Sequence, residues 1–406
     1  MAQKAGQKKW IRPRHALVWK YLFPVVALYS RLRYNISVDK FTEQGSRPYL
    51  VLMNHQTPFD QFFVGMAVKG PIYFLATEDI FSLGWVSGII RFLAAPIPIK
   101  KQTGDLQATM TCLRVAREGG TIALSPEGNR TYSGRTEHIN PAIAKLARHL
   151  KMPIAIFLIK GGYGTQPRWS DVIRKGKMHA SITRVIEPEE YRSLSDEELA
   201  ELIRQEMYVD EAVPGGPFIH SQQAEFLERA IYVCPHCGLS VFESHGDLVH
   251  CRNCGLTVRH LPSKVLEAVN GDFPFTSVGE WYDYQSDFVN RLDTREHTDT
   301  PLFRDTASLS EVIVYKHKEK RRKTCSVALY GDRVVIDEGA DSEMVLSFED
   351  VTALAVLGRN KANIYHDGRV WQLKGDKRFN ALKYVQLYYR NKNLAKGESD
   401  AKFLGL

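Results

Sequence analysis

The sequence predicts an α/β domain with a mainly parallel sheet, followed by a small cysteine-rich ribbon and a C-terminal β-barrel-like domain that is closed by a helix. Short apolar runs alternate with helical patterns from residue 48 to about residue 186, an order typical of a parallel sheet covered by helices on both faces. Two Cys-x2-Cys pairs follow, and short β-like runs separated by turns occupy residues 310–378. A chain of 406 residues is long enough for two or three domains.

Changes in composition along the chain indicate five segments. They are a basic amphipathic helix at residues 1–40, the α/β domain at 41–212, the ribbon at 228–262, a polar connector at 263–309, and the β-rich domain at 310–395. The boundary after the α/β domain coincides with a stretch rich in Pro and Gly, which is typical of a linker.

The N-terminal segment carries the net charge of the whole chain. Residues 1–40 contain nine Lys or Arg and one Asp, a charge of +8, so the remaining residues sum to zero. A basic end of this kind predicts an anionic partner such as a membrane surface or a nucleic acid, although a solvated tail would show the same charge. The residues expected to contact anionic lipid here are Lys8, Lys9, Arg12 and Arg14.

The apolar residues of this segment favour a membrane over a nucleic acid as the partner. Leu17, Tyr21, Val25, Leu28 and Leu32 recur at helical spacing among further aromatic residues, as in helices that lie in a membrane interface. The uninterrupted apolar run is far shorter than the roughly 20 residues that a membrane span requires. Because the six cysteines do not have the pattern of a secreted disulfide framework, we expect a cytoplasmic protein that is peripheral on the membrane and binds no nucleic acid.

The stretch VLMNHQTPFDQFF, residues 51–63, is the first candidate for a catalytic centre. An apolar run that reads as a buried strand ends in Asn54-His55, and His55 is the only one of 13 histidines with an Asp five residues later. Pro58 disfavours a continuous helix, so a turn can bring His55 and Asp60 together. An Asp that accepts a hydrogen bond from one ring nitrogen leaves the other nitrogen as a base for a hydroxyl group. A surface histidine beside a chance aspartate is the alternative.

A second candidate, LSPEGNRT at residues 124–131, also follows a strand-like run. Its Pro-Glu-Gly sequence predicts a rigid turn with exposed backbone N–H groups, and Arg130 offers a planar fork that suits a phosphate group. A simple turn in which Arg130 pairs with Glu127 is the alternative. In parallel sheets, ligands bind beyond the carboxyl ends of strands, and both candidate sequences are expected at such ends.

Taken together, NHQTPFD, SPEGNRT and the strand-like MPIAIFLIKGG resemble the motifs of the glycerolipid acyltransferases, the lysophosphatidic acid acyltransferase family with its His-x4-Asp signature. The resemblance covers residues 40–190, and the basic pair in APIPIKK is similar to a further motif in which the family usually has Arg. Where the family usually has Ser, Phe and Thr, this chain has Thr57, Ser125 and Asn129.

The resemblance implies transfer of an acyl group from acyl-CoA or acyl-carrier protein to a hydroxyl of a glycerol phosphate-type lipid in phospholipid biosynthesis, with 1-acylglycerol-3-phosphate as the expected acceptor. His55, oriented by Asp60, would act as the general base. The expected substrate-binding residues are Glu127, Gly128, Arg130, Lys100 and Lys101. Two alternatives stay open: a catalytically inactive lipid-binding membrane scaffold, and an acyltransferase for a different lyso- or aminolipid.

The sequences CPHCG and CRNCG predict a metal site. Cys234, Cys237, Cys251 and Cys254 have the spacing Cys-x2-Cys-x13-Cys-x2-Cys, and a glycine that permits a tight turn follows each pair. Four thiolates suit tetrahedral Zn²⁺ and leave no open position, so the zinc would be structural. Two disulfides are the alternative.

The β-rich segment at residues 310–395 is similar in pattern to pleckstrin-homology or GRAM domains. The basic stretch KHKEKRRKT, residues 316–324, lies between its first two predicted strands, where lipid-binding members of that superfamily have a basic loop. We therefore expect contacts with anionic lipid at Lys316, Lys318, Arg321 and Arg322, although the stretch could also be a solvated hairpin tip.

Overall fold

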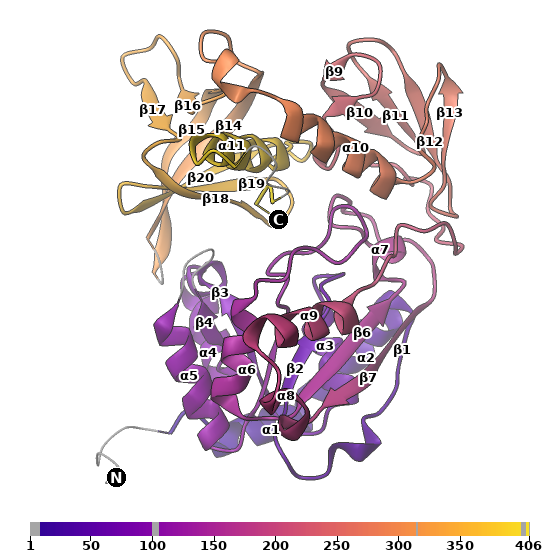
Figure 1. Ribbon diagram of the computed structural model, residues 1–406, viewed down its shortest axis with the longest axis vertical. Coiled ribbons are helices and arrows are strands. Elements are labelled where there is room, and N and C mark those ends of the chain that lie inside the picture. Colours follow the sequence, from indigo (N-terminus) through magenta and orange to yellow (C-terminus); the bar gives the residue numbers. More distant parts are fainter. Residues whose placement is uncertain (1–8, 100–104, 314–315, 399–402, 406) are drawn as a thin grey trace. The chain divides into compact units, whose positions relative to one another are not determined.

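The chain forms two compact units in the computed structural model, which describes residues 9–99, 105–313, 316–398 and 403–405 (Figure 1). Unit 1 consists of Met1–Arg130, Thr136–Gly162 and Lys177–Val209. Unit 2 consists of Thr131–Arg135, Tyr163–Gly176 and Asp210–Leu406. Each unit is therefore assembled from segments that are separated in the sequence.

Unit 1 is organised around a seven-stranded sheet with the order β1-β7-β6-β2-β5-β3-β4. Strands β6, β2, β5, β3 and β4 run parallel to one another, whereas β7 is antiparallel to β6, which confirms the predicted mainly parallel sheet. The strands are β1 (Ile36–Val38), β2 (Leu50–Met53), β3 (Ile72–Thr77), β4 (Ile97–Ile99), β5 (Thr121–Leu124), β6 (Ile154–Lys160) and β7 (Met178–Ile186). Every residue of β2 is buried, as expected for a central strand covered on both faces.

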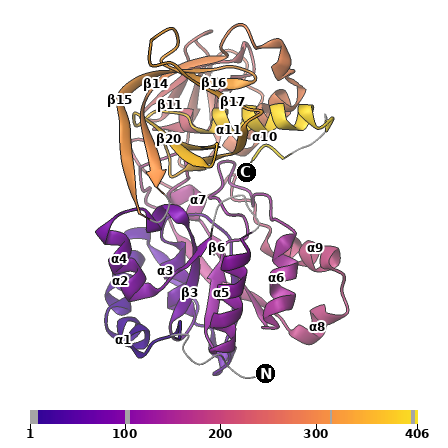
Figure 2. The same cartoon turned by 90° about the vertical axis from the view of Figure 1, so that its left-hand side faces the viewer.

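Helices cover this sheet and contribute to the apolar core of unit 1. They are α3 (Asp60–Ala67), α4 (Trp85–Ala94), α5 (Leu106–Arg117), α6 (Ala142–Leu150), α8 (Pro188–Arg192) and α9 (Asp196–Met207), and the short α7 (Gly162–Thr165) follows β6. Helices α5 and α6 lie side by side (Figure 2). Buried side chains such as Val115, Ile143 and Leu199 pack with Leu50 and Ile154 of the sheet. The periodic apolar positions of the sequence thus face the core.

Two further helices, α1 (Pro13–Tyr21) and α2 (Phe23–Tyr34), form the N-terminal part of unit 1. They meet at Leu22, beside Pro24, where that proline predicts a kink. The apolar stripe predicted to face a membrane is more than half exposed at each of its residues, which are Leu17, Tyr21, Val25, Leu28 and Leu32. Within the described part of the chain, no helix combines the length and the apolar character needed to cross a bilayer.

The basic residues predicted to contact lipid at this end differ in exposure. Lys9 and Arg12 are exposed, Arg14 is half-buried, and Lys8 lies outside the described residues. Arg14 stacks over the ring of Phe92, with its guanidinium carbon 4.3 Å from the ring centroid. This contact joins α1 to α4.

Helix α2 is held against α3 by a close contact at Gly65. A Cβ atom on Gly65 would lie 2.4 Å from Phe23 Cζ and 2.8 Å from Trp19 Cη2. The Trp19 and Phe23 rings are themselves stacked, with centroids 4.1 Å apart. No side chain fits at this position unless the stacked rings move, because protein interiors are close-packed. The glycine thus sets how closely the N-terminal helices approach α3.

We expect Gly65→Ala to lower thermal stability, although alanine is the better helix former. The added methyl group would push the Trp19–Phe23 stack away, and overpacking of this kind costs about 1–3 kcal/mol. Gly88, in α4, is the matched control because a Cβ there meets no atom within 4 Å. Gly88→Ala should stabilise the protein by up to about 1 kcal/mol through helix propensity. Thermal unfolding of both variants measures the difference, and equal stabilisation by both would contradict the close contact.

Unit 2 combines the cysteine-rich ribbon with the C-terminal β domain. The ribbon contains the pair β8 (Val233–Cys234) and β9 (Gly238–Leu239), and a sheet of β10 (Phe242–His245), β11 (Leu248–Cys251), β12 (Thr257–His260) and β13 (Leu266–Asn270). The second sheet is antiparallel, with the order β17-β16-β15-β14-β20-β19-β18.

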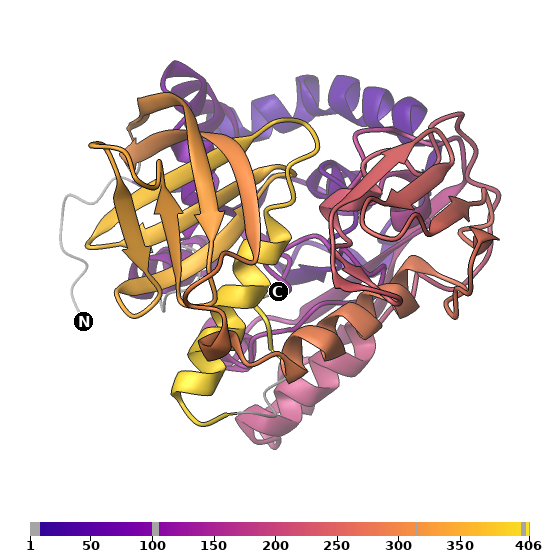
Figure 3. The same cartoon turned by 90° about the horizontal axis from the view of Figure 1, so that it is seen from above.

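The C-terminal sheet curls, and helix α11 (Leu382–Ala395) packs on it (Figure 3). Its strands are β14 (Phe303–Ile313), β15 (His317–Leu329), β16 (Arg333–Ile336), β17 (Met344–Ser347), β18 (Val351–Leu357), β19 (Lys361–His366) and β20 (Arg369–Gly375). The predicted β domain closed by a helix is thus confirmed as an architecture. Its similarity to pleckstrin-homology or GRAM domains stays a prediction.

Helix α10 (Val278–Arg291) joins the two sheets of unit 2 into one core. Trp281 is fully buried and donates from Nε1 to the Val233 carbonyl of β8 at 2.9 Å. Gln285, also buried, donates to Gln386 of α11 at 3.4 Å. The segment that the sequence predicts as a polar connector therefore supplies part of the shared core.

The basic stretch at residues 316–324 is not a loop. All of it except Lys316 lies in β15, which pairs with β14 over most of its length. The ion pairs of its arginines are Arg321–Glu311, Arg321–Glu319 and Arg322–Asp337. The prediction of a basic loop was wrong because these carboxylates offset the repulsion within the run and allow it to form a strand.

Candidate functional site

Strand β2 is tied to its neighbour β6 at the edge of the sheet where the candidate site begins. Asn54, the buried residue after β2, donates from Nδ2 to the Ile159 carbonyl at 2.9 Å and accepts from the Ile159 N–H at 2.8 Å. These two bonds extend the pairing beyond the backbone register, which ends at Met53 and Phe157. His55 therefore stands at the carboxyl end of a central parallel strand, the usual place for a ligand site.

The predicted approach of His55 and Asp60 is confirmed. Nδ1 of His55 lies 2.8 Å from Oδ2 of Asp60; the aspartate is fully buried, whereas 28% of the histidine side chain is exposed. A carboxylate that accepts a hydrogen bond from Nδ1–H fixes the tautomer, so Nε2 carries the lone pair. Nε2 is thus the ring nitrogen of His55 that can act as a base.

The carboxylate of Asp60 also accepts hydrogen bonds from the turn that precedes it. Its oxygens accept from the Gln56 N–H at 2.7 Å, from the Thr57 N–H at 2.9 Å and from the Thr57 hydroxyl at 2.7 Å. Asp60 is also the first residue of α3, where a helix N-terminus favours a negative charge. Thr57 differs from the serine usual in the resembling family by one methyl group and keeps the hydroxyl. These bonds hold the carboxylate, and through it the imidazole, in one orientation.

Glu127 bridges two backbone segments at the candidate base. Its Oε1 accepts from the His55 N–H and its Oε2 from the Glu137 N–H, both at 2.9 Å, and the side chain is buried. Burial raises the pKa of Glu127 to about 8, even though both N–H donors favour the charged form. The sequence predicts a substrate-binding carboxylate here, whereas the structure gives Glu127 a contact that positions the backbone of His55.

The loop after β5 lies next to His55 because β5 pairs with β2. Gly128 has φ +67°, a left-handed conformation that favours glycine, and its N–H closes a turn with the carbonyl three residues earlier at 3.1 Å. Arg130 follows this turn and is half-buried. Lys100 and Lys101, the other predicted substrate-binding residues, lie outside the described residues.

Tyr34, the last residue of α2, packs beside this centre and was missed by sequence analysis. Its buried ring lies 5.2 Å from the ring of Phe59 and 5.5 Å from that of Phe63, measured between centroids. Burial raises the pKa of Tyr34 to about 12, and the charges of Asp60 and Arg130 also act on it. In the sequence, Tyr34 is only one of several aromatic residues of the predicted interfacial helix, and it belongs to no motif that would indicate a site residue.

Comparison with known proteins assigns this region. Residues 34–160 match the family model described as Acyltransferase, and this range contains every residue of the centre described above. No curated protein matches the chain. Among solved structures, the chain is similar to the 1-acyl-sn-glycerophosphate (LPA) acyltransferase PlsC from Thermotoga maritima, with 20% identity and a TM-score of 0.41; the match covers 48% of this chain and 80% of that one.

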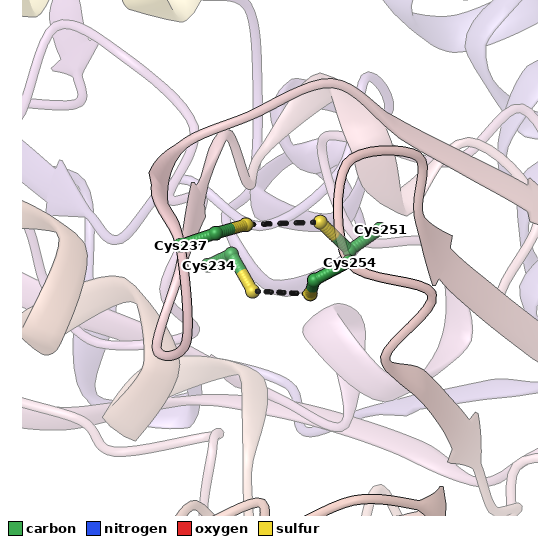
Figure 4. Close-up of side chains that lie close together, drawn as sticks. All are labelled: Cys234, Cys237, Cys251 and Cys254. Atoms are coloured by element: carbon green, nitrogen blue, oxygen red, sulfur yellow. Dashed lines mark hydrogen bonds between the residues drawn. The ribbon is translucent and has the colours of Figure 1, made fainter.

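Four cysteines of the ribbon converge outside the acyltransferase domain (Figure 4). The Sγ atoms of Cys234, Cys237, Cys251 and Cys254 all lie within 4.8 Å of one another, with 3.6 Å between Cys234 and Cys254 and 3.5 Å between Cys237 and Cys251. A disulfide bond measures about 2.0 Å, whereas a tetrahedron with Zn–S bonds of about 2.3 Å has edges of about 3.8 Å. The four thiols therefore fit a metal ion better than they fit two disulfides.

The glycine that follows each cysteine pair has the conformation this arrangement requires. Gly238 has φ +74° and Gly255 has φ +79°, values that residues with side chains rarely adopt. The turn before Gly238 directs the His236 N–H at Cys234 Sγ, 3.5 Å away. The predicted role of these glycines in tight turns around the sulfur atoms is consistent with these angles.

Glu127→Gln should slow acyl transfer and lower stability. The amide oxygen can accept only one of the two backbone N–H groups, and the NH₂ group would face the other, so a buried donor is left unsatisfied at a cost of about 1–3 kcal/mol. The resulting shift of His55 should lower turnover by about tenfold or more. Thermal unfolding and initial rates of the purified protein measure the two effects.

Glu118→Gln is the matched control for this change. Glu118 also accepts from two backbone N–H groups, those of Trp10 and Ile11, at 3.1 and 2.8 Å. The control should therefore lose stability but keep its turnover rate. A loss of rate equal to that of Glu127→Gln would rule out the positioning role.

The pH dependence of stability gives an independent check on Glu127. Its pKa in the folded protein, about 8, lies above the ordinary value of 4.5, so the unfolded chain releases this proton first and stability should fall as pH rises from about 4.5 to 8. Glu127→Gln should remove that part of the slope. A stability–pH profile that is parallel in the two proteins would show that the carboxyl group titrates normally.

Proposed function

We propose that the protein transfers an acyl group from an acyl thioester, either acyl-CoA or acyl-carrier protein, to a hydroxyl of 1-acylglycerol-3-phosphate in phospholipid biosynthesis. The observation that carries the proposal is the His55–Asp60 pair, whose atoms are 2.8 Å apart at the carboxyl end of β2 within the acyltransferase domain. A buried carboxylate behind a partly exposed imidazole is the arrangement that a general base for a hydroxyl group needs.

The proposed reaction follows from the free nitrogen of His55. Nε2 removes the proton of the acceptor hydroxyl while the oxygen attacks the carbonyl carbon of the thioester. The intermediate then collapses: a C–O ester bond has formed, the C–S bond breaks, and His55 returns the proton to the leaving thiolate. Asp60 keeps the imidazole in place and stabilises its charged form during this sequence.

Arg130 is the proposed ligand for the phosphate of the acceptor. A guanidinium group matches two phosphate oxygens at once, and Arg130 lies in the loop after β5, the strand that pairs with β2. Lys100 and Lys101 are proposed to assist, and Gly128 shapes the loop. An inactive lipid-binding scaffold is disfavoured because the bonds of Asp60 hold the imidazole of His55 in the orientation that a general base requires.

The proposal is tested with purified protein, acyl-CoA or acyl-carrier protein, and lysophosphatidate. We expect thioester consumption coupled to phosphatidate formation, and monoacylglycerol, which lacks the phosphate, should be a much poorer acceptor. Consumption only with another lyso- or aminolipid would change the acceptor. No consumption with any lysolipid would favour the scaffold.

His55→Ala should lower turnover by about 10²–10⁴-fold because it removes the general base. Asp60→Asn should act similarly, since an amide cannot accept all the donors that the carboxylate accepts. His179→Ala is the matched control: its Nε2 lies 3.0 Å from Asp39, but that pair is exposed, and the rate should not change. A folded His55→Ala protein with a rate near that of the wild type would refute the mechanism.

We also propose that the four cysteines bind one structural Zn²⁺. Four thiolates complete a tetrahedral shell, so no position is left for a substrate. Because binding of a structural metal contributes to folding energy and the ribbon shares a core with α10, removal of the metal would act through the fold of unit 2. The chemistry of His55 needs no metal.

Elemental analysis should find about one zinc per chain, as a closed four-thiolate site requires. A chelator should raise hydrogen exchange in residues 228–262 and lower thermal stability, whereas acyl transfer should decline only as unit 2 loosens. Very low zinc, with four thiols that react only after reduction, would favour disulfides. Instant loss of activity on chelation, restored at different rates by different metals, would instead indicate a catalytic metal.

We further propose that the protein binds the cytoplasmic face of a membrane through α1, α2 and α4. The exposed apolar stripe of the N-terminal helices is extended on α4 by Trp85 and Phe92, whose exposed fractions are 78% and 57%. Arg14 Nε donates to the Phe92 carbonyl at 3.0 Å, so the two surfaces adjoin. An apolar surface with basic residues such as Lys9 and Arg12 beside it suits an anionic bilayer.

Leu28→Gln combined with Leu32→Gln should weaken binding to vesicles of phosphatidylcholine and phosphatidylglycerol. Each exposed leucine that enters the bilayer contributes about 1.5–3 kcal/mol, so the loss should be at least about tenfold. Leu106→Gln is the control, because Leu106 is 75% exposed on α5, apart from the stripe. Flotation assays compare the variants, and an equal loss for Leu106→Gln would contradict the assignment of this surface.

A further inference from the structure

Unit 2 contains a cleft of about 720 Å³, bordered by the ribbon and the C-terminal sheet. Lys320, Lys323 and Lys374 line it from the sheet, and Val241 and Phe242 line it from the ribbon. We propose that this cleft is a binding site for a phosphate monoester. The site is separate from the acyl-transfer centre and goes beyond the proposed function.

A bulge in the hairpin of β14 and β15 places two of these lysines together. Where the register slips, Ser308 of β14 faces both Lys323 and Thr324 of β15, and on its other side Ser308 pairs with Lys374 of β20. Adjacent strands lie about 4.8 Å apart, so the backbones of Lys323 and Lys374 are about 10 Å apart across Ser308. Two flexible ammonium groups on such a row can reach the same phosphate, and bulges commonly redirect side chains in this way at functional sites.

Three of the four acidic residues that line the cleft are paired with cationic side chains, whereas these lysines are in no ion pair. Asp305, Glu228 and Glu243 pair with Lys383, Arg378 and Arg252, respectively. Asp376 accepts from a backbone N–H at 2.8 Å. Among the described residues, Lys320, Lys323 and Lys374 take part in no ion pair. Like charges gathered in one cleft repel one another, and a bound dianion relieves that repulsion.

The basic residues of β15 fall into two groups, those bonded within unit 2 and those that line the cleft. Arg321 and Arg322 form ion pairs with carboxylates, and Lys318 donates to Gln372 at 3.1 Å. These three residues, predicted from the sequence to contact lipid, are therefore bonded within unit 2, whereas the fourth, Lys316, is exposed in the turn before β15. Lys320 and Lys323, which were not selected, line the cleft. On β15 itself, the charge available to an external anion therefore lies in the cleft.

The lining of the cleft sets the class of ligand. Its volume lies in the range of small-molecule sites, about 300–1,000 Å³, and is larger than inorganic phosphate needs. Ammonium groups bind phosphate as point charges, and Ile231 and Phe379 add apolar surface. A phosphorylated small molecule and the headgroup of a phosphorylated lipid both present this combination, and the shared group is the phosphate monoester.

The test compares the double variant Lys323→Gln/Lys374→Gln with a matched double variant, Arg369→Gln/Lys396→Gln. The control removes the same charge from exposed positions of unit 2 that do not line the cleft. Equilibrium dialysis with glycerol 3-phosphate probes the free ligand. Flotation with phosphatidylcholine vesicles, with and without phosphatidate, probes the lipid. Both assays use the full chain, and thermal unfolding checks that the variants are folded.

We expect the cleft variant to lose about tenfold or more in affinity, because it lacks two charge-assisted hydrogen bonds to the phosphate, and we expect the control to match the wild type. If the cleft variant loses binding of glycerol 3-phosphate in dialysis, the ligand is a free phosphorylated molecule. If it loses only the additional vesicle binding that phosphatidate gives in flotation, the ligand is a lipid. The proposal is overturned if the wild type binds neither probe, or if both double variants lose binding equally. If the cleft variant fails to fold, Lys323→Gln alone replaces it under the same criteria.

Discussion

The hydrogen bonding of the buried Asp60 carboxylate is the interaction on which the candidate site depends. A charged group without access to water is tolerated only when donors surround it, and here the donors come from the imidazole of His55 and from the two residues that follow it. To satisfy the carboxylate, the chain must turn directly after β2 and start α3 at Asp60. The same requirement fixes the imidazole, so the conformation that stabilises the charge is also the one that presents Nε2.

The parts of this centre that follow local rules could be predicted from the sequence. The apolar runs located the strands, the spacing of His55 and Asp60 across Pro58 indicated the pair, and the two cysteine pairs indicated the cluster of thiols. These features depend on residues close together in the chain, or on side-chain chemistry that has few other uses. The mainly parallel sheet also followed from the alternation of strand and helix patterns.

Other features depend on register and packing, which a single sequence does not show. The backbone role of Glu127 exists because β5 lies beside β2, and the position of Tyr34 depends on how α2 meets α3. The basic run of β15 looked like a loop because its neutralising partners, such as Glu311 and Asp337, lie on other segments. In each case, the contact that determines the role of the residue joins segments that are brought together only by the fold.

The close fit at Gly65 has a practical consequence for anyone who wishes to separate membrane attachment from catalysis. Helices α1 and α2 are not a detachable tail, because one side packs on the helix that starts with Asp60 and the last residue, Tyr34, forms part of the wall beside the catalytic pair. A chain shortened to remove the proposed membrane-binding helices would also lose part of the wall of the candidate site, and its inactivity would say nothing about lipid binding. Substitutions on the outward face, which leave the inward face intact, are the way to study the two properties one at a time.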